Sequence, residues 1–134
     1  MNQPQSPFKS HGGLFRIVQA LRYSWRGLVA ACRHEAAFRQ ELLLAAVLTP
    51  VALWLSRSLS ELVLLVGTLV IVLIAELFNS AIEAVADAVT LEHHELIGRA
   101  KDLGSAAVFL SIILALAVWA SLLVSHVYFA IAQP

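Results

Sequence analysis

The organisation of this chain follows from one run of twelve residues, Glu76-Leu77-Phe78-Asn79-Ser80-Ala81-Ile82-Glu83-Ala84-Val85-Ala86-Asp87. The run continues directly from the uncharged, mostly apolar segment Leu62 to Ala75, which is typical of a membrane-spanning helix. At about 100° per residue, the polar side chains of the run share an arc of about 100° on one helical face. They form what we call the polar stripe: Glu76, Asn79, Ser80, Glu83 and Asp87. The other faces are apolar, so the sequence predicts one polar face at the end of a membrane helix.

The polar stripe has two interpretations. Charged groups at the edge of a membrane helix are costly, so they usually face a protein interior and mark a functional site. Alternatively, the helix simply leaves the bilayer there and its acids lie in water. A helix leaving the bilayer has no need of Asn79 and Ser80 on the same face as the acids. We therefore interpret the stripe as a candidate site.

The composition is that of a small integral membrane protein. Of the 134 residues, 60% are hydrophobic and 13% are charged, whereas soluble domains carry about 25% charged residues. We expect a disordered tail over 1–13 and a single membrane domain over 14–134. Because 1–13 is polar, we expect no cleavable signal, and the first span serves as an uncleaved anchor. Cys32 is the only cysteine, which excludes an intrachain disulfide.

The periodicity predicts an all-α membrane protein with one amphipathic surface helix and three transmembrane helices. The surface helix covers 14–40, where apolar residues and arginines alternate at helical spacing, and Gly27 is a candidate break. Ser60 is the expected N-cap of the second span. The spans are expected at about 40–56, 61–90 and 103–132, with a polar loop over 91–102.

The basic residues predict the orientation. Eight Lys and Arg side chains lie in the N-terminal segment and the 91–102 loop, and one lies in the 56–61 turn. By the positive-inside rule, the N-terminus and the 91–102 loop are cytoplasmic and the C-terminus is outside. We interpret the N-terminal arginines as membrane-surface anchors and expect no nucleic-acid partner.

The polar residues at the cytoplasmic side suit phosphoryl transfer. Glu35, Glu76 and Glu83 offer carboxylate oxygens and Asn79 offers an amide, while Mg²⁺ is usually held by one or two carboxylates plus phosphate oxygens. A carboxylate at the membrane edge can act as a general base toward a lipid hydroxyl. The phosphate-binding pattern G-x-x-x-x-G-K-S/T and the kinase glycine loop are both absent. The cations able to balance a polyphosphate are Arg16, Arg22, Arg26, Arg99 and Lys101.

The pair His93-His94, flanked by Glu92 and Glu95, raises the question of a zinc site. The H-E-x-x-H spacing is absent and no further ligands are placed nearby. Contacts to a nucleotide are the preferred interpretation.

Four blocks carry a resemblance to a known family: Tyr23 to Leu28, Glu35 to Glu41, Glu76 to Asp87 and His94 to Val108. In these blocks the chain resembles the small integral membrane diacylglycerol kinases of bacteria. The likeness runs from about Phe15 to His126. It implies a homotrimer in the bacterial inner membrane, with a periplasmic C-terminus, that transfers the γ-phosphate of MgATP to diacylglycerol and gives phosphatidic acid.

The resemblance also implies residue roles. Glu76 matches the catalytic base and Asn79 its essential polar partner, while Glu35 and Glu83 match the ligands of Mg²⁺. The positions implied to contact ATP are Arg16, Tyr23, Glu35, Glu83, Glu92, His93, His94, Lys101 and Asp102. Those implied to contact the lipid substrate are Arg16, Ser24, Trp25, Glu41, Glu76 and Ser105.

Three alternatives remain open at this point. The first is an undecaprenol kinase of the same family. The second is a proton-coupled transporter in which Glu76 carries the proton, although the stripe lies at one end of its span and not at the midplane. The third is a non-catalytic membrane anchor, which leaves Glu35, Glu76 and Glu83 without a purpose.

Overall fold

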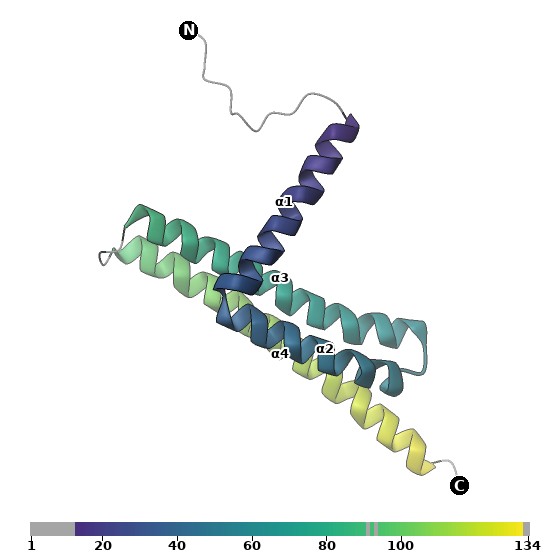
Figure 1. The fold of residues 1–134 in the computed structure, drawn as a ribbon. Coiled ribbons are helices and arrows are strands. Elements are labelled where there is room, and N and C mark those ends of the chain that lie inside the picture. The colour runs from purple at the N-terminus through teal and green to yellow at the C-terminus, as the bar shows by residue number, and fades with distance from the viewer. Residues whose placement is uncertain (1–12, 91, 93, 133–134) are drawn as a thin grey trace.

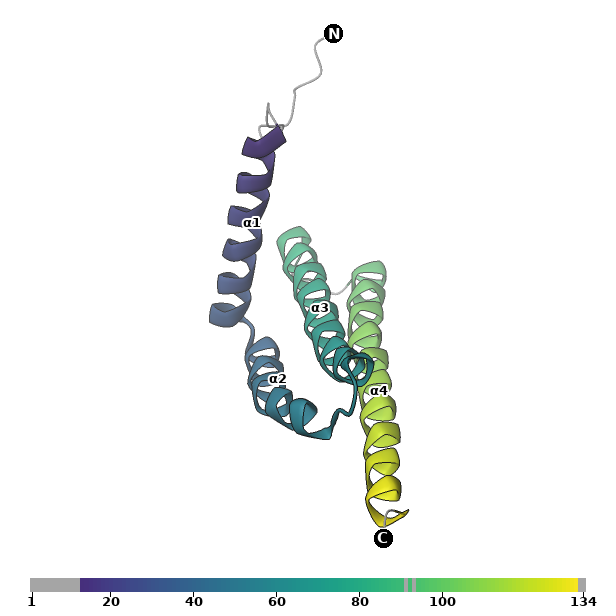
Figure 2. The ribbon, with the colours of Figure 1, turned by 90° about the vertical axis from the view of Figure 1, so that its right-hand side faces the viewer.

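The protein is a bundle of three long helices with a fourth helix projecting from it. The computed structural model describes residues 13–90, 92 and 94–132, and the regular structure within them is helical. The helices are α1 (Gly13–His34), α2 (Ala36–Leu55), α3 (Leu59–Val89) and α4 (Glu95–Ala132). In Figure 1, α3 and α4 run antiparallel along each other, α2 lies against them, and α1 points away. Figure 2 shows the same separation of α1 from the bundle.

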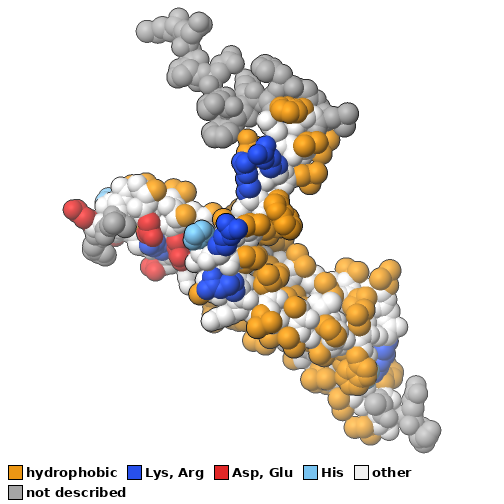
Figure 3. Space-filling model, viewed as in Figure 1, with side chains coloured by type: hydrophobic (Ala, Val, Ile, Leu, Met, Phe, Trp, Pro, Cys, Tyr) orange, Lys and Arg blue, Asp and Glu red, His pale blue; other side chains and the backbone are white. Residues whose placement is uncertain are grey.

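The predicted fold class is confirmed. Within the described part of the chain, α2, α3 and α4 are each long and apolar enough to cross a membrane. Most of their large apolar side chains are exposed and cover the surface drawn in Figure 3. Such a surface is untenable in water but suits lipid tails or neighbouring membrane helices. The chain is therefore a membrane protein. We expected a disordered tail over 1–13. Residues 1–12 of it lie outside the described residues.

The prediction of where the surface helix ends is wrong. We expected one helix over 14–40, but α1 ends at His34 and Glu35 has extended backbone angles of φ −101° and ψ 113°. The residues from Ala36 onward already belong to α2, and Gly27 lies within an unbroken α1. We call the break at Glu35 the elbow.

A side chain of α2 closes the elbow. The guanidinium of Arg39 donates from Nη1 to the carbonyl oxygens of Cys32 (3.4 Å) and Arg33 (3.3 Å). The last carbonyls of a helix have no partner within that helix, so a cation is favourable there. Arg39 thus satisfies the end of α1 and holds Glu35 between the two helices.

The predicted loop over 91–102 is too long, because α4 begins at Glu95 and extends well before residue 103. The amide of Gly98 donates to the carbonyl of His94 at 2.9 Å, at the start of the helix. Glu95 in the first turn is favourable at the positive end of the helix dipole. The beginning of α3 also differs, since Ser58, and not Ser60, caps it by accepting from the amide of Glu61.

The tightest packing lies at the end of the bundle where α2 turns into α3. Ala52, Leu55 and Leu65 are buried there, and the indole Nε1 of Trp119 in α4 donates to the carbonyl of Leu65 at 3.3 Å. Partly buried apolar residues complete this cluster: Leu62, Val66, Trp119 and Leu122. In the view of Figure 3 the acidic side chains gather at the opposite end, whereas Glu61 lies in the first turn of α3.

Arg57 joins the α2–α3 turn to α4. Its Nη2 donates to the carbonyl oxygens of Ser125 (3.3 Å) and His126 (2.7 Å), and its guanidinium lies 4.7 Å from the ring centre of Phe129. His126 Nδ1 lies 3.1 Å from the carbonyl oxygen of Leu55. We call these contacts the far-end clasp.

Candidate functional site

The polar stripe of α3 changes from buried to exposed along the helix. Glu76 is only 5% exposed, although it carries a carboxyl group. Asn79 and Glu83 are half-buried, and Asp87 is exposed. The side chains of the stripe thus become more accessible toward the end of α3. A buried acid within a membrane helix is costly and indicates a functional role.

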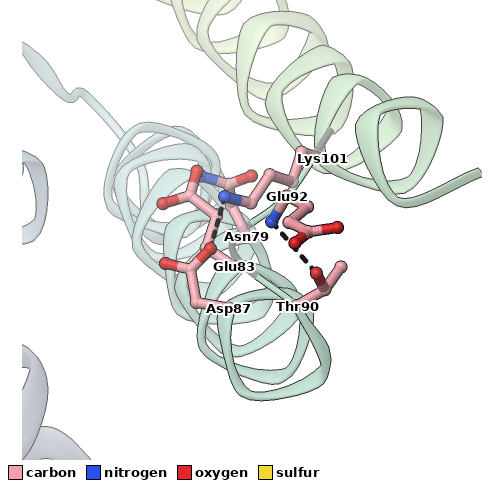
Figure 4. Close-up of polar contacts among 6 residues, drawn as sticks. All are labelled: Asn79, Glu83, Asp87, Thr90, Glu92 and Lys101. Atoms are coloured by element: carbon pink, nitrogen blue, oxygen red, sulfur yellow. Dashed lines mark hydrogen bonds and ion pairs between the residues drawn. The ribbon is translucent and has the colours of Figure 1, made fainter. Parts of the chain in front are cut away.

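Asn79 links two parts of the stripe (Figure 4). Its Nδ2 donates to Glu83 Oε1 at 2.9 Å, one helical turn away. Its Oδ1 is buried and has no hydrogen-bond partner among the described residues. The carboxamide therefore donates to Glu83 through Nδ2, while its Oδ1 is enclosed between the helices.

Asp87 is paired with a cation from α4. Lys101 Nζ lies 2.7 Å from Asp87 Oδ1, across the antiparallel helix pair (Figure 4). Lys101 also lies near enough to Glu83 for their charges to interact. The pair places one fixed ammonium group beside the outer half of the stripe.

Two further carboxylates lie near Glu76. Glu35 at the elbow and Glu41 in α2 are half-buried, and each is close enough to Glu76 for their charges to interact. Glu83 is likewise within electrostatic range of Glu76. Glu41 Oε2 is buried without a hydrogen-bond partner in the described structure. Four carboxylates from three segments thus converge, which is an unfavourable arrangement without a cation.

The convergence suits a cation that brings ligands of its own. Within residues 13–90, 92 and 94–132, no three His, Cys, Asp or Glu side chains are grouped closely enough to hold a metal unaided. Glu35 and Glu83 are still carboxylates of the type Mg²⁺ takes, and Mg²⁺ usually completes its shell with phosphate oxygens and water. The donor set therefore fits a metal–nucleotide complex better than a free resident ion.

A cleft of about 720 Å³ separates α1 from α3. Glu35 at the elbow lines the cleft, together with Ser24 of α1 and Ser80 of α3. His34 also lines it, and the remaining lining residues are small or apolar: Gly27, Leu28, Ala30, Ala31, Leu77, Ala81 and Ala84. The cleft is open enough to admit a ligand to one side of the stripe.

A second cavity, of about 320 Å³, is a groove among α2, α3 and α4. Glu41 is its one charged lining residue. Its other lining residues are apolar: Leu44, Ala45, Leu48, Leu69, Val72, Ile112, Ala115, Leu116 and Trp119. A groove of this kind suits a hydrocarbon chain whose polar end lies toward Glu41.

Other predicted site residues are not brought together within one chain. Arg16 and Tyr23 are exposed on α1, outside the cleft. Trp25 is 69% exposed and lines a surface depression with Arg26 and Arg33, on a different face of α1 from Ser24.

The remaining described residues of the prediction lie in the α3–α4 loop or in the first third of α4. Four of them are exposed: Glu92, His94, Asp102 and Ser105. The amide of Glu92 donates to Thr90 Oγ1 at 3.0 Å, which fixes the start of the loop (Figure 4). His93 lies outside the described residues.

Three contacts that shape this site were not predicted from the sequence, although Asp87 itself is a named member of the polar stripe. Arg39 closes the elbow, Asp87 holds Lys101, and Gly104 lies against Asn79. Asp87 was already part of the polar stripe, but its pairing with Lys101 was not predicted. Gly104 offered only a weak signal, a small residue within an otherwise helical pattern.

The chain is similar in sequence to a known protein family and to several of its members. Residues 22–123 match the model of the family described as prokaryotic diacylglycerol kinase. The chain is 50% identical over 114 residues to the diacylglycerol kinase of Escherichia coli (strain K12), covering 85% of this chain and 93% of that protein. It is 50% identical over 118 residues to the diacylglycerol kinase of Pseudomonas aeruginosa, covering 88% and 96%. The diacylglycerol kinase of Helicobacter pylori (strain 26695) is 36% identical over 107 residues, covering 80% and 84%.

Proposed function

The chain belongs to the prokaryotic diacylglycerol kinase family, and we propose that it transfers the γ-phosphate of ATP to diacylglycerol, giving phosphatidic acid. The observation that carries this proposal beyond the family name is the buried carboxylate of Glu76, with three further carboxylates around it. It lies in a membrane helix, with an open cleft and an apolar groove on neighbouring faces of the bundle. This arrangement can bring a lipid alcohol and a nucleotide together.

Glu76 is the proposed general base. Its carboxylate accepts the proton of the diacylglycerol hydroxyl while that oxygen forms a bond to the γ-phosphorus. The bond from the γ-phosphorus to the bridging oxygen of ATP breaks, and ADP leaves. A positioned general base contributes about 10²–10⁴ to the rate of such a step, and the buried position of Glu76 keeps competing water away.

Glu35 and Glu83 are the proposed ligands of Mg²⁺. When bound, Mg²⁺ neutralises the negative charge of the phosphates during the transfer. Glu35 comes from the elbow and Glu83 from the outer half of the stripe. Asn79 donates to Glu83 at 2.9 Å and so orients this carboxylate.

Lys101 is the proposed anchor of the nucleotide phosphates, since it presents an ammonium beside the stripe. Asp87 holds that ammonium in place. The other proposed ATP contacts are Arg16, Tyr23, Glu92, His93, His94 and Asp102.

The apolar groove beside Glu41 is the proposed site of an acyl chain of the lipid, because its lining is otherwise hydrocarbon. The hydroxyl of the lipid would then lie toward Glu41 and Glu76, which interact electrostatically. The other proposed lipid contacts are Arg16, Ser24, Trp25 and Ser105.

We further propose a homotrimer in the bacterial inner membrane, with the N-terminus and the α3–α4 loop in the cytoplasm. The extensive exposed apolar surface supports association with lipid and with other copies. Arg16 and Tyr23 do not line the cleft that Glu35 lines, which suits a site completed by a neighbouring subunit. The excess of basic residues at the N-terminal side supports the orientation.

The test is a kinase assay on the purified chain in mixed micelles, with ATP labelled at the γ-phosphate and Mg²⁺. Diacylglycerol and undecaprenol are compared side by side. We expect labelled phosphatidic acid. Preferential labelling of undecaprenol would change the acceptor, and no labelled lipid with either acceptor would contradict the proposed activity.

A further inference from the structure

Gly104 of α4 lies buried against the side chain of Asn79 in α3. A Cβ atom on this glycine would lie 2.5 Å from Asn79 Oδ1 and 3.5 Å from Asn79 Cγ. It would also lie 3.4 Å from Ile82 Cδ1, which is an ordinary contact. Non-bonded carbon and oxygen atoms do not approach to 2.5 Å, so a methyl group at Gly104 would force the carboxamide of Asn79 to move.

The backbone does not explain the glycine. Gly104 lies within the regular helix α4, and its φ is not in the left-handed region that favours glycine. Glycine is among the least favourable residues in a helix interior, where alanine is the most favourable. The explanation therefore lies in the space that the missing side chain leaves for Asn79.

That space determines how the carboxamide is oriented. Asn79 Oδ1 occupies it, buried and without a hydrogen-bond partner among the described residues. The other end of the same planar group, Nδ2, then points along α3 and donates to Glu83 Oε1 at 2.9 Å. Displacing Oδ1 rotates the plane and removes the donor from Glu83.

We propose that Gly104 is a positioning residue that orients the Asn79 carboxamide and, through it, the Glu83 carboxylate that receives the divalent cation. The inference rests on the proposed function for the role of Glu83, but its geometry involves only Gly104, Asn79 and Glu83. Partners that orient a metal-ligating side chain typically affect metal affinity about 10–100-fold. Gly104 acts one step further back, by shaping the space that such a partner occupies.

The first test is Gly104→Ala in the full chain. Binding of Mn²⁺ is titrated by electron paramagnetic resonance with a non-hydrolysable ATP analogue present, so that turnover is not required. We expect the Mn²⁺ affinity to fall about tenfold or more. Wild-type Mn²⁺ affinity in a folded Gly104→Ala variant would overturn the inference.

Two matched controls exist within the same helix pair. Gly98 in α4 and Gly67 in α3 would each accept a Cβ with nothing within 4 Å. Gly98→Ala and Gly67→Ala therefore make the same chemical change without touching Asn79. We expect both to bind Mn²⁺ with wild-type affinity, and an equal loss in all three variants would overturn the inference.

A double variant separates orientation of Asn79 from simple helix packing. In an Asn79→Ser background the carboxamide is gone, so adding Gly104→Ala should change the Mn²⁺ affinity and the unfolding temperature little further. If Gly104→Ala alone does not fold, the double variant should fold, because the clash is absent. An undiminished effect of Gly104→Ala in that background would show that packing alone is responsible and would overturn the inference.

The two proposals fail in different ways. An active wild-type enzyme with a Gly104→Ala variant that binds Mn²⁺ normally overturns the role of Gly104 alone. A wild-type chain that phosphorylates neither lipid contradicts the proposed function, while the Mn²⁺ comparison still decides the role of Gly104.

Discussion

Lys101 Nζ lies 2.7 Å from Asp87 Oδ1, and this ion pair connects α4 to the last polar position of the α3 stripe (Figure 4). The side chains of Lys101 and Asp87 are 39% and 56% exposed, and water screens the attraction within an exposed pair, so this pair adds little to stability. The main effect of the pair is therefore to keep the ammonium group of Lys101 in one position. The cation that we propose for the nucleotide phosphates is kept beside Glu83 by an acid from the neighbouring helix.

Asp87→Asn should weaken nucleotide binding more than chemistry. The neutral amide holds the ammonium less firmly, so we expect KM for ATP to rise about twofold to fivefold, the range that loss of one exposed ion pair can account for. The change in kcat should be small. Steady-state kinetics at varied ATP measure both constants.

The control is Glu95→Gln, which removes one exposed negative charge from the first turn of α4. It should leave KM for ATP unchanged. Equal rises of KM in Asp87→Asn and Glu95→Gln would show a general charge effect and not a held lysine.

Glu76→Gln should abolish most of the turnover while the protein stays folded. The amide has nearly the same shape but cannot accept the hydroxyl proton, so kcat should fall by about 10²–10⁴. Because a buried carboxyl is replaced by a neutral group, the unfolding temperature should not decrease. Kinase assays and thermal unfolding in detergent check the two statements, and near-normal kcat would remove Glu76 from the role of base.

Glu83→Gln and Glu35→Gln should raise the Mg²⁺ requirement. Losing a direct ligand is expected to cost at least as much as losing an orienting partner, so the half-activating Mg²⁺ concentration should increase about tenfold or more. Mg²⁺ titration of the kinase rate at saturating lipid measures this. The control is Glu76→Gln, which should bind Mn²⁺ with wild-type affinity. If Glu76→Gln lost as much Mn²⁺ affinity as the other two variants, the carboxylates would hold the metal as one group.

Arg57→Ala should destabilise the protein without changing the kinase rate. The variant removes two charged hydrogen bonds to carbonyls of α4 and the contact with the Phe129 ring, all part of the far-end clasp. Given the exposure of Arg57, we expect a loss of about 1–2 kcal/mol in the free energy of unfolding. Arg57→Lys keeps the charge but not the planar fork and should recover only part of it. A lowered kcat with unchanged stability would contradict a purely structural role.

The fold class could be predicted because its causes are local. A run of apolar residues long enough to cross the hydrocarbon is visible in the sequence, and so is the one-sided spacing of Glu76, Asn79 and Glu83. The burial of Glu76 followed from the same reasoning. These features depend on helix geometry within a single segment.

The rest depended on contacts between segments. At the end of α1, which is His34, Arg39 of the next helix reaches back to the carbonyls of Cys32 and Arg33. The capping of α3 by Ser58 instead of Ser60 follows from the turn, which no propensity distinguishes. The pairing of Asp87 with Lys101 and the space at Gly104 exist only because α3 and α4 lie antiparallel in one particular register.

The unbroken helix α3 fixes the spacing and the relative orientation of the proposed proton acceptor and the proposed metal ligand. Glu76 and Glu83 are seven residues apart on it. One residue inserted between them would turn Glu83 by about 100° around the helix axis and shift it by about 1.5 Å. Insertions and deletions within this interval therefore disrupt the site. Even a conservative change in length there would separate the two halves of the reaction, although every side chain that performs it would still be present.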